Sequence, residues 1–222
     1  YTVSYGTDGL SLRIVYMDAT KGWIPTVDAA VSDVPVVPTT QRAAFGYGAI
    51  TTYSSLKNLV NSSGVVAADV TGVGTARSYL AASGYGGDKG IFGFGTTDSV
   101  SAVTNLLSNA GVIATDTSGV GTARSGVAGT VYDTDKAIFA YGNAGGVVSM
   151  SNLVSNAGVV ATDVTGVGTA RQGLAAAGYG GDKAIFGYGY TGSNVSITNL
   201  VSSAGVVATD VTGVGTARRF IS

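Results

Sequence analysis

The chain repeats itself every 47 residues, and this period constrains the fold more than any other feature. The string GVGTAR recurs without insertion or deletion, ending at Arg77, Arg124, Arg171 and Arg218. Three other markers keep the same step: an aromatic-Gly motif around Phe45, Phe92, Phe139 and Phe186, Asn-Leu pairs beginning at Asn58, Asn105, Asn152 and Asn199, and acidic residues at Asp69, Asp116, Asp163 and Asp210. Each copy must therefore meet its neighbours in the same way, as in rotationally repeated or stacked architectures.

One copy reads as four short strands. From Arg171, residues 171–180 are mostly small, KAIFGYG is rich in Ile and aromatic residues, and VSITNLV alternates polar and apolar residues, which predicts three strands. VVATDV predicts the fourth, after a Ser-Ser-Ala-Gly turn. Four strands with Gly, Asn and Asp turns within 47 residues match a β-propeller blade. A parallel β-helix is the alternative, but its rungs are shorter and do not need four hairpin turns.

The sequence therefore predicts an all-β protein in which residues 42–222 form a four-bladed β-propeller. Blade 1 begins at its second strand. We expect RRFIS, residues 218–222, to pair with the strand containing Ala43 to Tyr47 and so supply the missing first strand. Closure by this C-terminal strand removes exposed sheet edges.

The first 41 residues lie outside the repeat. Residues 1–28 contain LSLRIVYMDATKGWIP, whose alternation predicts a short N-terminal β segment that ends a preceding module. Residues 29–41 contain two prolines and no glycine, which predicts an extended linker. Because the first residue is Tyr1, we expect a processed product or a piece of a longer polypeptide.

Missing residue types narrow the function. The chain has no His, Cys or Glu, so it lacks the commonest general base, thiolate chemistry and the usual metal-ligand sets. A net charge of -1 gives no basic footprint for nucleic acid, and no apolar run reaches the roughly 18 residues of a membrane span. We predict a non-enzymatic protein without catalytic residues, cofactor, metal, nucleic-acid partner or membrane insertion.

Two repeated acidic features could still carry chemistry. Each repeated aspartate could act with the arginine that follows it as an acid-base pair. The alternative is that the aspartate begins a structural turn, and its repetition in all four copies favours this interpretation. Paired aspartates in a glycan-processing propeller remain the enzymatic alternative. The Asp-Lys turns at Asp88-Lys89, Asp182-Lys183 and Asp133 to Lys136 could bind calcium, although such residues more often solvate a hairpin.

Two zones differ among the copies. One is the turn between second and third strands (AITTYS, TTDSVS, NAGGVV and YTGSNV), and the other is the residue pair after each repeated Arg. In an up-and-down blade both emerge on one face, and loops on rigid scaffolds often bind partners. Drift in solvated turns is the alternative, but exposed aromatic residues are typical binding anchors. We predict a partner-binding face that carries Tyr53, Tyr79, Asp98, Tyr190, Asn194 and Phe220.

The repeat resembles that of the kelch family over residues 42–222. The resemblance lies in the order of its parts, which are Arg-x-Gly-Leu-Ala-Ala-Ala-Gly-Tyr-Gly-Gly, then an aromatic residue, a Gly-rich segment and a polar turn. The repeat departs from that family in having Gly-Tyr-Gly for the double glycine after the second strand, and Val or Ile for the fourth-strand Trp, at Val66, Ile113, Val160 and Val207. The fold expected is therefore kelch-like.

GVVATD, GVGTAR and DKAIFGYG also resemble repeats in structural proteins of tailed bacteriophages, and LRIVYMDATKGW is similar to endings of phage fibre and collar modules. The resemblance implies an extracellular virion appendage that binds other virion proteins or a host-surface glycan or protein. Among the partners we also expect further copies of this chain, in a homo-oligomer formed through the N-terminal segment. A propeller lectin is the alternative function.

Overall fold

The computed structural model of the chain describes residues 14–20, 22–25 and 43–221. The chain divides into two compact units, residues 1–40 and 41–222. In the first unit, β1 (Ile14–Asp18) and β2 (Gly22–Pro25) form an antiparallel hairpin. The expected linker, residues 29–41, lies outside the described residues.

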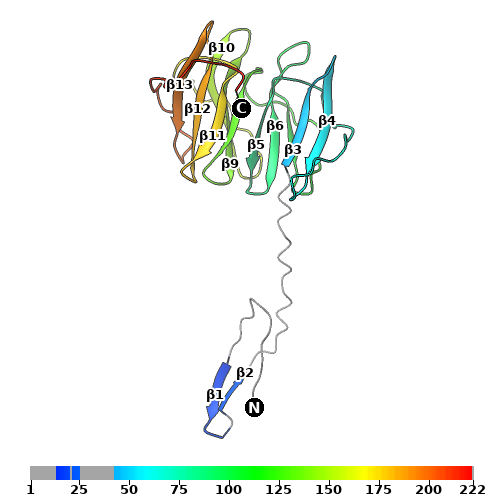
Figure 1. Ribbon diagram of the computed structural model, residues 1–222, viewed down its shortest axis with the longest axis vertical. Coiled ribbons are helices and arrows are strands. Elements are labelled where there is room, and N and C mark those ends of the chain that lie inside the picture. Colours follow the sequence, from blue (N-terminus) through cyan, green and yellow to red (C-terminus); the bar gives the residue numbers. More distant parts are fainter. Residues whose placement is uncertain (1–13, 21, 26–42, 222) are drawn as a thin grey trace. The chain divides into compact units, whose positions relative to one another are not determined.

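Four small antiparallel sheets make up the second unit, one for each copy of the repeat (Figure 1). We number the repeats 1 to 4; they end at Arg77, Arg124, Arg171 and Arg218. Repeat 1 contains β3 (Ala43–Ala49) and β4 (Tyr53–Val60), and repeat 2 contains β5 (Ala81–Tyr85), β6 (Lys89–Gly93) and β7 (Thr104–Leu107). Repeat 3 contains β8 (Ala128–Tyr132), β9 (Lys136–Asn143) and β10 (Val147–Val154), and repeat 4 contains β11 (Ala175–Tyr179), β12 (Lys183–Tyr190) and β13 (Asn194–Val201). No helix occurs among the described residues, so the all-β prediction is confirmed.

The turn of the first hairpin in a repeat contains residues in the left-handed backbone conformation. Repeat 2 uses Gly86 and Gly87, with φ of 60° and 79°, a conformation that glycine adopts at no steric cost. Repeat 3 has Asp133 and Thr134 in their place, with φ of 47° and 59°. The turn geometry is therefore kept in repeat 3 at a cost in backbone strain.

One aromatic residue at the end of the second strand also has a positive φ in every repeat. The residues are Tyr47 (64°), Phe94 (65°), Tyr141 (63°) and Tyr188 (64°). Bulky side chains rarely adopt this conformation. Here it accompanies ring packing between successive repeats: the centroids are 5.2 Å apart for Tyr47 and Phe92, and 5.5 Å for Phe94 with Phe139 and for Tyr141 with Phe186. The rings meet edge to face, a favourable arrangement that offsets the strain.

The expected fourth strand of each blade does not form a strand, so that part of the prediction is wrong. In repeat 1, residues 65–70 contact β4 through two isolated bridges, at Val66 and Val70. Backbone hydrogen bonds join Lys57 and Val70 in both directions, and Ala67 N donates to Leu59 O at 2.8 Å. Between these bonds the side chain of Asn58 donates to Ala67 O at 3.1 Å, so a side chain interrupts the backbone ladder. The other repeats show the same two bridges and the same amide contact.

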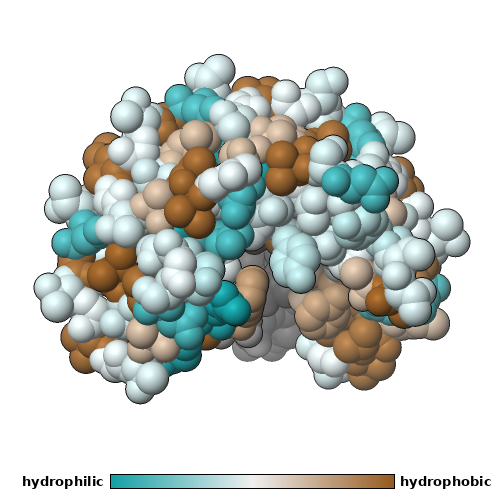
Figure 2. Space-filling model, turned by 90° about the horizontal axis from the view of Figure 1, so that it is seen from above, coloured by the Kyte–Doolittle hydropathy of each residue, from teal (hydrophilic) through white to brown (hydrophobic). Residues whose placement is uncertain are grey.

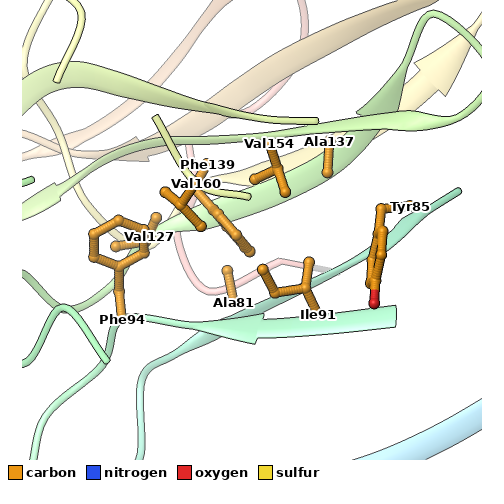
Figure 3. Packing of buried hydrophobic residues seen from close by; sticks show 9 residues of the cluster. All are labelled: Ala81, Tyr85, Ile91, Phe94, Val127, Ala137, Phe139, Val154 and Val160. Carbon is orange, nitrogen blue, oxygen red and sulfur yellow. The ribbon is translucent and has the colours of Figure 1, made fainter. Parts of the chain in front are cut away.

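Three seams join the four repeats, and the first strands β5, β8 and β11 lie side by side. The seam between repeats 2 and 3 buries the residues in Figure 3: Ala81, Tyr85, Ile91, Phe94, Val127, Ala137, Phe139, Val154 and Val160. An equivalent cluster lies one period further on, between repeats 3 and 4. The apolar core is therefore divided among the seams between repeats.

The predicted closure by the C-terminus is wrong. Within the described residues β3 pairs only with β4, and residues 219–221 form no strand. Phe220 N instead donates to Gly173 O at 2.7 Å. The physical reason is register: residues 218–221 lie one period after residues 171–174, which precede β11, so RRFIS corresponds to the link before a first strand. Figure 2 shows the repeats as an arc that is open on one side.

Candidate functional site

The repeated aspartate joins each repeat to the one before it. The Asp163 carboxylate accepts hydrogen bonds from Thr122 N at 2.9 Å and Thr122 Oγ1 at 2.7 Å, from a residue 41 positions earlier. It also accepts one from Asn152 Nδ2 of its own repeat, at 2.9 Å. The contacts to threonine recur one period away in each direction, between Asp116 and Thr75 and between Asp210 and Thr169. The carboxylate thus serves as an acceptor at the seam.

Electrostatics keep these aspartates ionised. Burial by itself would raise the pKa of Asp163, but hydrogen bonds from Thr122 and Asn152 and the charge of Arg124 hold this pKa below its ordinary value. Arg124 Nη1 lies 3.7 Å from Asp163 Oδ1. The pKa values of Asp116 and Asp210 are lowered in the same way, against the effect of burial. A general acid at neutral pH needs the opposite shift.

The repeated arginine is the buried centre of each seam. Arg124 is fully buried and donates from Nε to Tyr141 O at 2.9 Å, from Nη1 to Thr122 O at 3.0 Å and from Nη2 to Asn152 Oδ1 at 2.6 Å. Its guanidinium lies over the Phe94 ring, with Cζ 4.1 Å from the centroid. Burial lowers the pKa of Arg124 to about 10, so it stays charged at neutral pH. Its five donors and flat face suit this position better than an ammonium group would.

The same arrangement is incomplete at the two open ends of the arc. Among the described residues the Asp69 carboxylate accepts only from Asn58 Nδ2, at 2.8 Å. Arg218 is exposed, donates to Thr216 O at 3.2 Å and stacks on Tyr188. Phe45 is 62% exposed, whereas its equivalents are almost fully buried: Phe92 (4%), Phe139 (0%) and Phe186 (0%). The ends of the arc therefore carry seam residues without a neighbouring repeat.

The Asp-Lys turns pair internally. The Nζ to Oδ distances are 2.9 Å for Lys89 and Asp88, 2.8 Å for Lys136 and Asp133, and 2.9 Å for Lys183 and Asp182. In the described ranges no three acidic side chains gather in a way that could hold a metal ion. The lysine ammonium groups form ion pairs with the carboxylates that would have to bind calcium.

The residues that vary among repeats lie at one end of the repeat unit. In Figure 1 the chain enters β3 at the lower end, so the β3–β4 turn lies at the upper end, which Figure 2 shows. The bridges Ser78–Thr96 and Gln172–Tyr190 hold the links between repeats beside the turns. The predicted residues fall at these turns (Tyr53, Asp98, Tyr190 and Asn194) or in the links (Tyr79 and Phe220).

A run of backbone hydrogen bonds connects the four links. Gly126 N donates to Tyr79 O at 2.8 Å, Gly173 N to Gly126 O at 3.0 Å, and Phe220 N to Gly173 O at 2.7 Å. The first and last members of this run meet through their side chains, because the ring centroids of Tyr79 and Phe220 are 6.3 Å apart. The structure therefore brings together two predicted residues that are 141 positions, or three periods, apart.

Arg219 lies in the variable pair after the last repeated Arg, but it is not among the residues predicted for the binding face. Its Cζ lies 4.2 Å from the centroid of the Tyr190 ring and 5.4 Å from that of Phe220. Tyr190, Arg219, Phe220 and Tyr79 thus form one continuous stack, which we call the aromatic row. The available signal was the doubled arginine in RRFIS, because Ser78, Ser125 and Gln172 follow the repeated arginine in the other copies. Tyr53, Asp98 and Asn194 are not members of the row.

The described part of the chain contains no helix long and apolar enough to cross a bilayer. A scan against known protein families finds no match, and neither does a search of curated protein sequences.

Proposed function

We propose that this protein is a non-enzymatic structural and adhesion module of a bacteriophage appendage, such as a fibre or collar, outside the host cell. Its partners are neighbouring virion proteins or a glycan or protein of the host surface, and copies associate through the N-terminal segment. The resemblance of GVVATD, GVGTAR and DKAIFGYG to phage repeats supports the virion assignment.

The observation that carries the proposal is that the repeated polar side chains bond to neighbouring repeats. In a chain without His, Cys or Glu, the repeated Asp and Arg are the polar groups that recur in every repeat and would first be considered for catalysis. At the seams Asp163, Arg124 and their equivalents instead bond to groups of neighbouring repeats. The lowered pKa of each seam aspartate fits this structural use.

The fold we propose for this module is a four-bladed, kelch-like propeller. The contact between Tyr79 and Phe220 supports it, because the link after repeat 4 returns to the link after repeat 1, as expected for four repeats in one turn. Phe45 and Arg218 at the open ends also match residues that are buried at the three seams. A first strand added beside β3 would complete repeat 1 and close the ring.

The proposal is tested on virus particles. Virus particles would be purified from the sample in which the gene for this chain is found. Gold-labelled antibodies raised against the full chain should mark an appendage of these particles, and mass spectrometry should find the chain in them. Absence of the chain from purified particles would overturn the virion assignment. Hydrolysis of a glycan, ester or phosphoester that survives purification, and is lost on substitution of one aspartate, would overturn the non-enzymatic assignment.

A further inference from the structure

Two residues of the aromatic row occupy positions that other repeats give to glycine. Tyr79, Gly126, Gly173 and Phe220 are one period apart, and Tyr79 and Phe220 have φ of 50° and 52°. A side chain in this left-handed conformation costs free energy that glycine avoids. Burial does not offset the cost, because Tyr79 is 61% and Phe220 63% exposed. Strained residues of this kind cluster at functional sites.

The backbone below the row is fixed. Hydrogen bonds of 2.7 to 3.0 Å join the four links, and the Gln172–Tyr190 bridge ties the third link to β12. The Phe220 ring lies close over Gly173, where a methyl group would approach it to 2.9 Å. The row is therefore held in place before any ligand arrives, which lowers the entropic cost of binding.

Arg219 leaves its hydrogen-bonding edge available. Among the described residues its guanidinium makes no ion pair or hydrogen bond, and it lies over the rings of Tyr190 and Phe220. The planar guanidinium binds a carboxylate through two parallel hydrogen bonds. One end of the repeat unit thus presents two exposed rings beside an available carboxylate-binding group.

We propose that the aromatic row binds a carboxylated sugar unit of an acidic surface glycan. The C–H face of the pyranose packs on Tyr79 and Phe220, and the sugar carboxylate accepts hydrogen bonds from Arg219. This inference rests on the proposed adhesive function and names the ligand class for its binding end.

The surroundings of the row favour a glycan over a macromolecule with a larger footprint. The adjoining turns TTDSV, NAGGV and YTGSN are rich in small residues, and Figure 2 shows hydrophobic areas separated by polar ones at this end. A stable protein interface needs a broader packed patch. The net charge of -1 offers little to a nucleic-acid backbone.

The test is calorimetric titration of the full chain with trigalacturonate, with maltotriose as the neutral sugar of the same length. We expect trigalacturonate to bind about tenfold more tightly than maltotriose, and to bind less tightly as salt is added. Arg219→Gln should remove this preference, and Arg219→Lys should restore only part of it, because an ammonium group keeps the charge without the planar fork.

The glycine pattern supplies variants that separate binding from folding. Tyr79→Gly and Phe220→Gly recreate the residues of the second and third links, so the melting temperature should be unchanged or slightly higher. Affinity for trigalacturonate should fall about tenfold in each. Tyr53→Ser, an exposed tyrosine outside the row, is the matched control and should leave affinity unchanged.

Four results would overturn the inference. The first two are equal affinity for the two sugars and no affinity for either. The others are unchanged affinity in Tyr79→Gly and a melting temperature lowered by several degrees in Tyr79→Gly, which would mark a structural residue. Labelling of virus particles by the antibodies would stand in each case, so failure of this ligand assignment is distinguishable from failure of the virion proposal.

Discussion

Asp163 Oδ2 accepts a hydrogen bond of 2.7 Å from Thr122 Oγ1, a residue 41 positions earlier and one repeat away. The same Asp–Thr hydrogen bond is found in all three seams. The 47-residue period therefore repeats the contact between neighbouring repeats as well as the sheet within each repeat. Stability in such a protein is a sum of repeat terms and seam terms. Polar residues that would suit chemistry in another setting contribute here to the seam terms.

A buried arginine should be far more sensitive to substitution than its exposed equivalent. Arg124→Lys leaves the acceptors of Tyr141 and Asn152 without their fixed partners, and we expect a loss of about 2 to 3 kcal/mol in the free energy of unfolding. Arg218→Lys, at the open end, should cost no more than about 0.5 kcal/mol. Urea denaturation of both variants makes the comparison, and equal losses would contradict a seam role for Arg124.

Acid should destabilise the protein through the seam aspartates. The folded-state pKa values of Asp116, Asp163 and Asp210 are below their ordinary value, so the folded protein binds fewer protons than the unfolded chain as these groups titrate. Their contribution is present above pH of about 4 and is lost as pH falls through the folded pKa. Urea midpoints measured from pH 7 downward should fall below about pH 4. Asp163→Asn should make that fall shallower, and an unchanged slope would contradict the assignment.

Two glycines with the same backbone conformation provide a test of seam packing. Gly158 and Gly64 have φ of 79° and 76°, but a methyl group at Gly158 would lie 2.8 Å from Leu106 Cδ2 and 2.9 Å from Tyr85 Cε2, while nothing lies within 4 Å at Gly64. Both alanine substitutions cost about 1 kcal/mol in backbone strain, and Gly158→Ala should cost about 1 to 3 kcal/mol more through overpacking. Equal losses in thermal unfolding would show that no such seam exists.

Completion of repeat 1 should close the arc. A chain in which the sequence of residues 175–181 follows Ile221 supplies the first strand that β3 lacks. We expect a higher melting temperature and a larger cost for Gly64→Ala, whose methyl group would then meet Tyr179 and Leu200, the equivalents of Tyr85 and Leu106. An extension of the same length made of Gly and Ser is the control. An equal response to both extensions would contradict the four-bladed ring.

The period and the strand patterns predicted the all-β class and the antiparallel hairpins, because each depends on local residue order. The sequence could not reveal that the Asn58 amide interrupts the fourth ladder, since an Asn within a strand pattern also fits an ordinary surface position. The RRFIS error was one of register: the motif marks the link after a repeated arginine, and the strand begins four residues later. Stacking of Arg219 on Tyr190 depends on how the last link folds back over β12, which no local pattern encodes.

The most direct test of the central claim, that the repeated polar residues join successive repeats, is a double-mutant cycle between Thr122→Val and Asp163→Asn. Free energies of unfolding from urea denaturation would be measured for the parent, both single variants and the double variant. We expect a coupling of about 1 to 2 kcal/mol, because Thr122→Val removes the hydroxyl donor and Asp163→Asn replaces the charged acceptor with a weaker, neutral one. A second cycle, between Thr122→Val and Asp69→Asn, pairs residues of different seams and should show additive effects. Additive effects in the Thr122 and Asp163 cycle, within about 0.3 kcal/mol, would contradict the claim.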